Sequence, residues 1–275
     1  RNTVGSPPME ISRPASLDEA LDLLDAEPGA TPLAGGTDLM VQVNYDHLRP
    51  GAVIALRRVT ELADMDGRWI GAGVTWSRLE RGPWPALAQA ARTVGSPQIR
   101  NAGTLGGNLG TASPAGDGLP FLAALDAEVV LASKENGRRT LRWDEFITGP
   151  KQNGRRPGEL ILGVRLPEHV PTAQGFAKVG TRNAMVISIA SACLMRREDG
   201  AVRLALGSVG PTPVRARRAE TMISGERRPG PTAIEEFGRL VAEEVRPITD
   251  HRSTEAYRRH ASGVIARRLL ERALG

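Results

Sequence analysis

The spacing of apolar residues along the chain predicts short helices and buried strands that alternate over its first two-thirds. Leu17, Leu21 and Leu24 recur at helical spacing behind Ser16, a good N-cap, so we expect a helix over 17–26. Short apolar runs bounded by glycine or proline indicate strands instead. Strands are expected at 31–33, 53–56, 69–72, 127–132 and 160–166, and further helices at 84–94 and from Pro120.

The pattern changes near residue 175. Three strands at 175–179, 186–196 and 202–209 are expected, with a hairpin turn at Asp199-Gly200, and three helices follow. The last helix has an apolar face formed by Tyr257, Ala261, Val264, Ile265 and Leu269. We therefore expect an α/β domain over 1–174 and a smaller α+β domain over 175–275.

A first glycine-rich segment follows the strand at 31–33. It reads Leu33-Ala34-Gly35-Gly36-Thr37-Asp38-Leu39. Paired glycines let consecutive backbone N–H groups converge on an anion without obstruction by a Cβ, and Thr37 adds a hydroxyl donor. Taken alone, the segment fits a structural turn between a strand and a helix equally well.

A second polar segment has six glycines between residues 103 and 118. We expect no regular element there, but a long ordered loop or a loop capped by short turns. Both glycine-rich segments are poor in large side chains, which suits an extended polar ligand lying between them. Asp117 is placed to accept a hydrogen bond from a ribityl or ribose hydroxyl, or else to cap the helix that follows.

Known nucleotide and metal motifs are absent from the sequence. Neither glycine-rich segment has the P-loop pattern, and Gly71-x-Gly73 lacks the third glycine of a dinucleotide-binding fold. Cys193 is the only cysteine, so no disulfide, four-cysteine iron–sulfur cluster or structural zinc site can form within the chain. The four histidines are scattered, so we expect no metal site, and any metal redox centre must lie on another polypeptide.

Charge and composition restrict the possible partners. The net charge is +5, but the arginines recur as scattered pairs rather than one stripe, and aromatic residues make up only 4%. Both features argue against nucleic-acid binding. No apolar run approaches the length of a membrane span, and residues 1–8 lack the apolar core of a signal peptide. We expect a cytoplasmic protein.

Two segments identify a resemblance to a known family. Residues 34–39 (AGGTDL) and 99–109 (IRNAGTLGGNL) closely resemble the FAD-binding, or medium, subunit of the molybdenum hydroxylases of the xanthine and carbon monoxide dehydrogenase type. Residues 70–76 and 176–179 fit the same family, so the resemblance covers nearly the whole chain. It implies an FAD domain of the vanillyl-alcohol-oxidase (PCMH) type, followed by a small α+β domain with a three-stranded antiparallel sheet and three helices.

The resemblance also implies which residues bind FAD. Lys178 would approach the pyrimidine side of the flavin; it is otherwise an exposed strand lysine, and Arg182 is a weaker candidate. Leu162 would lie against the adenine or flavin region, while Gly110 replaces a bulkier residue of some relatives. The residues expected to cradle the diphosphate are Leu33, Ala34, Gly35, Gly36, Thr37, Asp38, Leu39, Thr104, Gly106, Gly107 and Asn108. Those expected along the rest of the FAD chain are Thr111, Ser113 and Asp117.

The implied function is electron transfer within a larger complex. FAD should be noncovalent, because neither glycine-rich segment contains the histidine or cysteine to which some flavoproteins of this fold attach it. The family implies a small subunit with iron–sulfur (2Fe-2S) clusters and a large subunit with molybdopterin, and an acceptor such as NAD or oxygen. We assign no catalytic residue to this chain. Two alternatives remain, a self-contained FAD-dependent oxidase and a flavin-binding protein without turnover.

Overall fold

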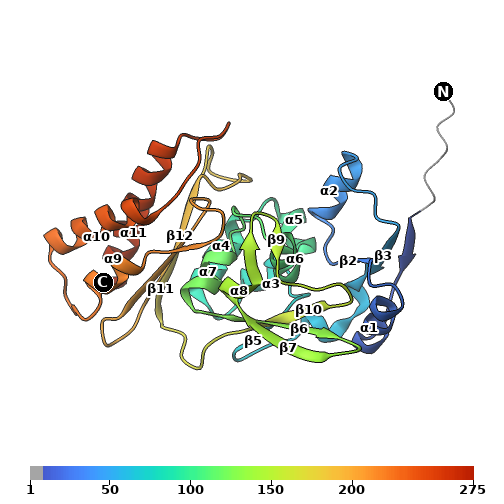
Figure 1. The fold of residues 1–275 in the computed structure, drawn as a ribbon. Coiled ribbons are helices and arrows are strands. Elements are labelled where there is room, and N and C mark those ends of the chain that lie inside the picture. Colours follow the sequence, from blue (N-terminus) through green and yellow to red (C-terminus); the bar gives the residue numbers. More distant parts are fainter. Residues whose placement is uncertain (1–8) are drawn as a thin grey trace.

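The computed structural model describes residues 9–275. Residues 1–8, in which no signal-peptide core is expected, lie outside the described residues. The described strands form four sheets, of three, five, four and two strands. In Figure 1 the small N-terminal sheet lies at one end of the molecule, the five-stranded sheet in the middle, and the C-terminal sheet with its helices at the other end.

The N-terminal sheet is parallel, with β3 (Ala52–Ala55) between β1 (Glu10–Ser12) and β2 (Thr31–Leu33). Helix α1 (Leu17–Ala26) connects β1 to β2, and the Ser16 hydroxyl accepts a hydrogen bond from the Glu19 N–H as expected of an N-cap. The helix over 17–26 and the strand over 31–33 are therefore confirmed. The remaining elements of this part are α2 (Leu39–Asn44) and the 3-10 turns η1 (Leu56–Arg58) and η2 (Thr60–Ala63).

The five-stranded sheet is antiparallel and holds the strands expected near 69–72, 127–132 and 160–166. Its order is β4 (Met65–Asp66), β5 (Trp69–Gly71), β10 (Leu160–Arg165), β6 (Glu128–Ser133) and β7 (Gly137–Arg142). Five helices separate β5 from β6: α3 (Trp76–Leu79), α4 (Pro85–Thr93), α5 (Pro97–Ala102), α6 (Leu105–Thr111) and α7 (Leu119–Ala124). After β7 come α8 (Trp143–Phe146) and a two-stranded sheet of β8 (Ile147–Gly149) and β9 (Gln152–Asn153).

The expectation that residues 103–118 contain no regular element is wrong. Helix α6 occupies much of this segment, although three of its seven residues are glycine. Thr104 begins the helix as its N-cap, with its hydroxyl accepting from the Gly107 N–H at 3.0 Å. Leu105 and Leu109 are completely buried on one side of it. Tertiary burial and a cap thus outweigh the low helix propensity of glycine.

The C-terminal part contains one antiparallel sheet and three helices. Its strands are β11 (Ala173–Val179), β12 (Ala190–Arg196), β13 (Val202–Gly207) and β14 (Val214–Arg215), in that order. The two-residue strand β14 is a fourth member that the expected three-stranded sheet did not include. The helices are α9 (Arg217–Ile223), α10 (Pro231–Glu244) and α11 (Glu255–Leu274). On α11, Tyr257 is exposed rather than part of the buried face.

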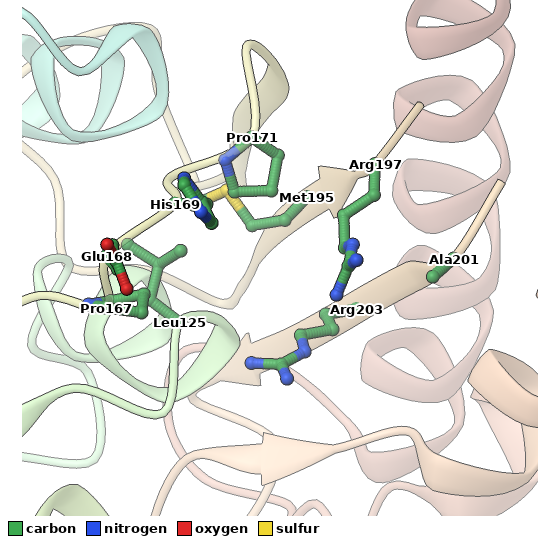
Figure 2. Close-up of a pocket in the computed structure, with 9 residues that line it drawn as sticks. All are labelled: Leu125, Pro167, Glu168, His169, Pro171, Met195, Arg197, Ala201 and Arg203. Carbon is green, nitrogen blue, oxygen red and sulfur yellow. The ribbon is translucent and has the colours of Figure 1, made fainter. Parts of the chain in front are cut away.

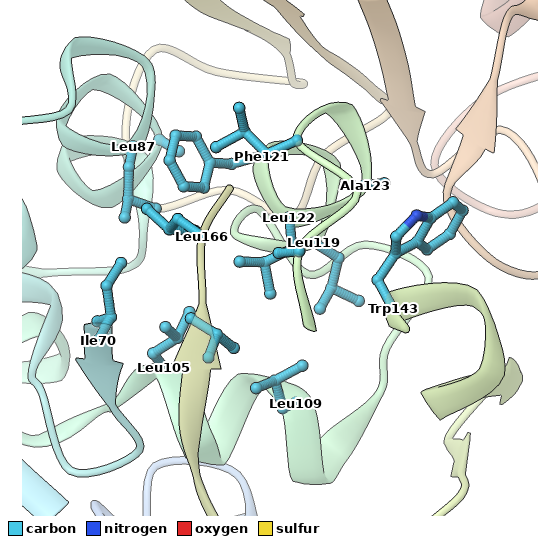
Figure 3. Packing of buried hydrophobic residues seen from close by; sticks show 14 of the residues in the cluster. Ile70, Leu87, Leu105, Leu109, Leu119, Phe121, Leu122, Ala123, Trp143 and Leu166 are labelled. Carbon is cyan, nitrogen blue, oxygen red and sulfur yellow. The ribbon is translucent and has the colours of Figure 1, made fainter. Parts of the chain in front are cut away.

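The core of the middle part continues into the C-terminal sheet. Figure 3 shows Leu105 and Leu109 of α6 close to Leu119 and Leu122 at α7. The same cluster includes alternate residues of the C-terminal sheet: Phe176, Cys193, Met195 and Ala205. The other face of that sheet packs against α9, α10 and α11. The division near residue 174 stays a prediction, because the two parts share this core.

Candidate functional site

A large cavity of about 740 Å³ lies where the N-terminal sheet meets the helices of the middle part. One wall is the segment that leaves β2, and the opposite wall is α6 with the loop that follows it. The chain that follows β5, the start of β10 and the turns η1 and η2 also contribute to the lining. Two segments about 70 residues apart in the sequence are thus brought together around one space.

The first glycine-rich segment forms one wall. Gly35 packs against the junction between α5 and α6, because a Cβ there would lie 1.9 Å from the Ala102 carbonyl oxygen. Within the part of the chain that the structure describes, the backbone N–H groups of Gly35, Gly36 and Thr37 donate no hydrogen bond. Three consecutive donors beside a cavity are suited to bind an anion. All the residues expected here line the cavity: Leu33, Ala34, Gly35, Gly36, Thr37, Asp38 and Leu39.

The second segment forms the opposite wall, and its two central glycines differ in role. A Cβ at Gly106 would lie 2.5 Å from the Ala72 Cβ, so this glycine lets α6 pack closely against the chain after β5. At Gly107 a Cβ would meet only the Thr104 hydroxyl, at 3.3 Å. Gly107 therefore leaves room in the cavity itself. The expected residues that line this wall are Thr104, Gly106, Gly107, Asn108, Thr111, Ser113 and Asp117.

Asp38 links the two walls. Its Oδ2 accepts hydrogen bonds from the Thr111 hydroxyl at 3.1 Å and from the Gln42 amide at 2.7 Å. Thr111 is the last residue of α6, while Gln42 belongs to α2. The carboxylate thus holds the first segment, α2 and α6 in a fixed arrangement around the cavity.

Asp117 and Lys178 form a buried ion pair at the edge of the cavity. The Lys178 Nζ lies 2.5 Å from the Asp117 Oδ2, and each side chain is 7% exposed. Lys178 also donates to the Thr93 carbonyl oxygen at 3.2 Å. Asp117 lines the cavity but Lys178 does not, so Lys178 is neither an exposed strand lysine nor a direct part of the wall. The alternative that Asp117 caps α7 is wrong, because α7 has no side-chain cap.

Two buried oxygen atoms on this wall have no hydrogen-bond partner. They are the Asn108 Oδ1 and the Asp117 Oδ1. Burial raises the pKa of Asp117 to about 6, while Lys178 opposes that shift. Buried polar atoms are rarely left unsatisfied, so these two indicate a polar ligand between the walls. The cavity, the three free N–H groups and the two oxygens fit an extended molecule with an anionic centre and hydroxyl groups, as FAD is.

Leu162 lies in the hydrophobic core rather than in the cavity lining. It is 3% exposed and packs with the cluster beneath the N-terminal sheet. The ladder between β10 and β6 shifts register between Ile161 and Gly163, and Leu160 and Ile161 are the residues of β10 that line the cavity. The irregular strand thus presents Leu160 and Ile161, rather than Leu162, to the cavity. Arg182 is exposed and donates to carbonyl groups of its own loop.

Several lining residues lie outside the glycine-rich segments. Trp76 and Val94 contribute apolar surface, while Gly110, which belongs to the second segment, leaves space opposite Ile161. Lys151 and Arg155 reach the cavity from the chain around β9. In the sequence, Lys151 and Arg155 are basic residues in a turn-rich stretch, but no motif distinguished them from the many other basic residues.

A second, smaller cavity of about 230 Å³ lies between the 167–171 linker and strands β12 and β13 (Figure 2). Arg197 and Arg203 extend into it from the sheet. Both are already neutralised, Arg197 by Asp199 at 3.0 Å and Arg203 by Asp126 at 2.9 Å. It therefore has no free charge with which to bind an anion.

The remaining chemistry of the described residues is limited. They contain no cluster of three or more histidine, cysteine or acidic side chains able to hold a metal ion. Cys193 is buried, and burial raises the pKa of its thiol. Residues 9–275 include no helix long and apolar enough to cross a membrane.

Comparison with protein families gives matches over nearly the whole chain. A model described as the FAD binding domain in molybdopterin dehydrogenase matches residues 7–169, and one described as the CO dehydrogenase flavoprotein C-terminal domain matches residues 176–273. The nicotinate dehydrogenase FAD-subunit of Eubacterium barkeri is 34% identical over 236 residues, covering 78% of this chain and 79% of the relative. The carbon monoxide dehydrogenase medium chain of Hydrogenophaga pseudoflava is 28% identical, covering 97% of each.

Solved structures give the same result. A chain of quinoline 2-oxidoreductase from Pseudomonas putida 86 superposes with a TM-score of 0.89 at 26% identity, over 98% of this chain and 97% of that one. A chain of carbon monoxide dehydrogenase from Hydrogenophaga pseudoflava, in a form that lacks the Mo-pyranopterin moiety, gives 0.87 at 29% identity, over 97% of each. The expected fold, an FAD-binding domain followed by a small C-terminal domain, is confirmed.

Proposed function

This chain belongs to the FAD-binding medium subunits of the molybdopterin dehydrogenases, and we propose that it passes electrons from iron–sulfur clusters of a partner subunit to an acceptor such as NAD or oxygen. The family consists of oxidoreductase subunits, so the enzyme is an FAD-dependent oxidoreductase. The observation that supports this role for the chain is the cavity between the two glycine-rich segments, with its free donors on one wall and unpartnered oxygens on the other.

The two walls would divide the binding of FAD between them. The N–H groups of Leu105 and Gly106 already donate to Val74 and Ala72 carbonyl groups. The free N–H groups at Gly35 to Thr37 are therefore the backbone donors we assign to the diphosphate. On the other wall, the buried, unpartnered oxygen atoms of Asn108 and Asp117 would have to turn toward the cavity to accept hydrogen bonds from hydroxyl or N–H groups of the cofactor.

Lys178 would act through Asp117. Its ammonium group is fixed 2.5 Å from the carboxylate and is shielded from solvent, so it holds Asp117 in place and limits the negative charge facing the cavity. When bound, FAD supplies the two-electron and one-electron redox chemistry of its ring, whose potential depends on the charges nearby. The pair is therefore a proposed determinant of that potential rather than a catalytic acid.

Two partner subunits complete the proposal. With one cysteine in 275 residues, this chain cannot hold an iron–sulfur cluster of its own. The solved relative from Hydrogenophaga pseudoflava is a molybdenum enzyme by its description. We infer a small iron–sulfur subunit and a large molybdopterin subunit for this chain too, with FAD bound noncovalently.

An anaerobic comparison tests this division of labour. The isolated FAD-loaded chain and the complex reconstituted with both partners receive the same purine, aldehyde or N-heterocycle, and flavin absorbance is followed. We expect bleaching only in the complex, while artificial dyes still exchange electrons with the isolated chain. Rapid bleaching of the isolated chain by substrate would overturn the proposal and favour a self-contained oxidase.

A further inference from the structure

Three cations line the FAD cavity without an ion-pair partner among the described residues: Arg57, Lys151 and Arg155. Arg57 and Lys151 are exposed, so water screens their charge. Arg155 is half-buried. Lys178, the other cation near this space, is neutralised by Asp117. Arg155 is therefore the cation of the lining whose charge is both partly removed from water and unpaired.

The local structure fixes Arg155 beside the end of α6. Asn153 lies two residues earlier, at the end of β9, and its amide donates to the Gly110 carbonyl oxygen at 2.8 Å. The Asn153 Oδ1 accepts from the Arg155 N–H at 3.1 Å. In addition, the Lys151 N–H donates to the Ala112 carbonyl oxygen at 3.0 Å. The chain that carries Arg155 is thus attached to the same helix that forms one wall of the cavity.

The nearby carboxylate is already engaged by other groups. Glu159 accepts two hydrogen bonds from Arg139, and its Oε2 also accepts from the Arg156 N–H at 2.6 Å. The Arg155 side chain has only the Glu159 carbonyl oxygen, at 2.9 Å from its Nη1. Burial lowers the pKa of Arg155, although a guanidinium remains charged at neutral pH. Glu159 attracts the Arg155 charge through space but forms no ion pair with it, so the half-buried cation would be stabilised by an anion in the cavity.

We propose that Arg155 is a cofactor-binding residue whose guanidinium pairs with the diphosphate of FAD, an assignment that rests on the proposed function. The diphosphate is the anionic part of FAD, and the N–H groups of Gly35 to Thr37 offer it hydrogen bonds but no full positive charge. The planar fork of arginine matches phosphate oxygens and adds charge-assisted hydrogen bonds. Arg155 would select the dinucleotide over flavins that lack a diphosphate.

The test compares Arg155→Met with the matched control Arg156→Met, since Arg156 is adjacent but exposed. The apoprotein is titrated with FAD, FMN and riboflavin, and flavin fluorescence gives each Kd. We expect Arg155→Met to raise the Kd for FAD about 10- to 100-fold and to leave that for riboflavin unchanged. Arg155→Lys should recover part of the loss, and Arg156→Met should bind all three flavins as the unaltered chain does.

Two results would overturn the assignment. FAD affinity that survives Arg155→Met places the arginine away from the cofactor, whereas an equal loss for FAD and riboflavin assigns it to the flavin ring or to the fold. Thermal unfolding of the apoprotein identifies a folding defect, in which case Arg155→Gln replaces the methionine variant. An unaltered chain that binds no FAD would refute the proposed function itself, so the two failures are distinguishable.

Discussion

Replacing Gly107 with valine should weaken FAD binding without unfolding the protein. The new Cβ meets only the Thr104 hydroxyl at 3.3 Å, and no positive φ opposes a branched residue at this helical position. The apoprotein should therefore tolerate the change. The two added methyl groups, however, occupy space in the cavity wall that faces the proposed diphosphate site.

The size of the effect follows from overpacking. Forcing extra methyl groups into an occupied site costs about 1–3 kcal/mol, which corresponds to a loss of about 5- to 150-fold in affinity for FAD. The Kd is measured by titrating the apoprotein with FAD, and the midpoint of urea unfolding is measured in the absence of FAD. We expect a raised Kd and an unchanged midpoint.

Gly106 provides the matched control. There even the Cβ of alanine would lie 2.5 Å from the Ala72 Cβ and 2.6 Å from the Ala72 carbonyl oxygen. Gly106→Ala should therefore lower the stability of the apoprotein itself. If Gly107→Val binds FAD like the unaltered chain, α6 does not form the cofactor wall and the assignment of the second segment is wrong.

Two further predictions concern the mode of binding and the buried carboxylate. Acid precipitation of the FAD-loaded chain should release all the yellow colour into the supernatant; colour retained in the pellet would contradict noncovalent binding. The folded pKa of Asp117, about 6, exceeds its unfolded value, so its contribution to stability is complete below pH ~4 and is lost as the pH rises through ~6. Urea unfolding of the apoprotein between pH 4 and 7 should record this loss, and the double variant Asp117→Asn/Lys178→Met should lack it. If the free energy of unfolding depends on pH identically in both proteins, the raised pKa of Asp117 is refuted.

The two glycine-rich segments singled out in the sequence line one cavity in the structure, and their assignment to FAD stays a prediction. The sequence did not predict α6, since glycine disfavours helices and the burial of Leu105 and Leu109 depends on elements distant in the chain. Leu162 was placed in the lining by resemblance, but an irregularity in β10 presents its neighbours to the cavity. The role proposed for Arg155 could not be predicted from the sequence. Arg155 lacks an ion-pair partner because Arg139 is hydrogen-bonded to Glu159, and this contact depends on the tertiary structure.

The burial of Lys178 beside Asp117 could not be predicted from the sequence for a similar reason. A strand pattern indicates on which face a residue lies, but not which side chain of another element meets it there. Asp117 is 61 residues away in the sequence, and the pair forms only because α4 and the loop before α7 lie beside β11. Pairwise contacts of this kind depend on tertiary packing, which local spacing does not encode.

The sheet of the C-terminal part has hydrophobic residues on both faces, and this has a consequence for how the protein unfolds. Cys193 and Met195 pack into the core of the FAD domain, while Ala192 and Leu194 pack against the C-terminal helices. Arg215, which Glu220 of α9 holds in place, crosses the junction by donating to the Ala123 carbonyl oxygen. Neither part can separate without exposing one face of this sheet to water. We therefore expect the regions matched by the two family models to unfold as a single cooperative unit, in which FAD bound in one half also stabilises the other against denaturation.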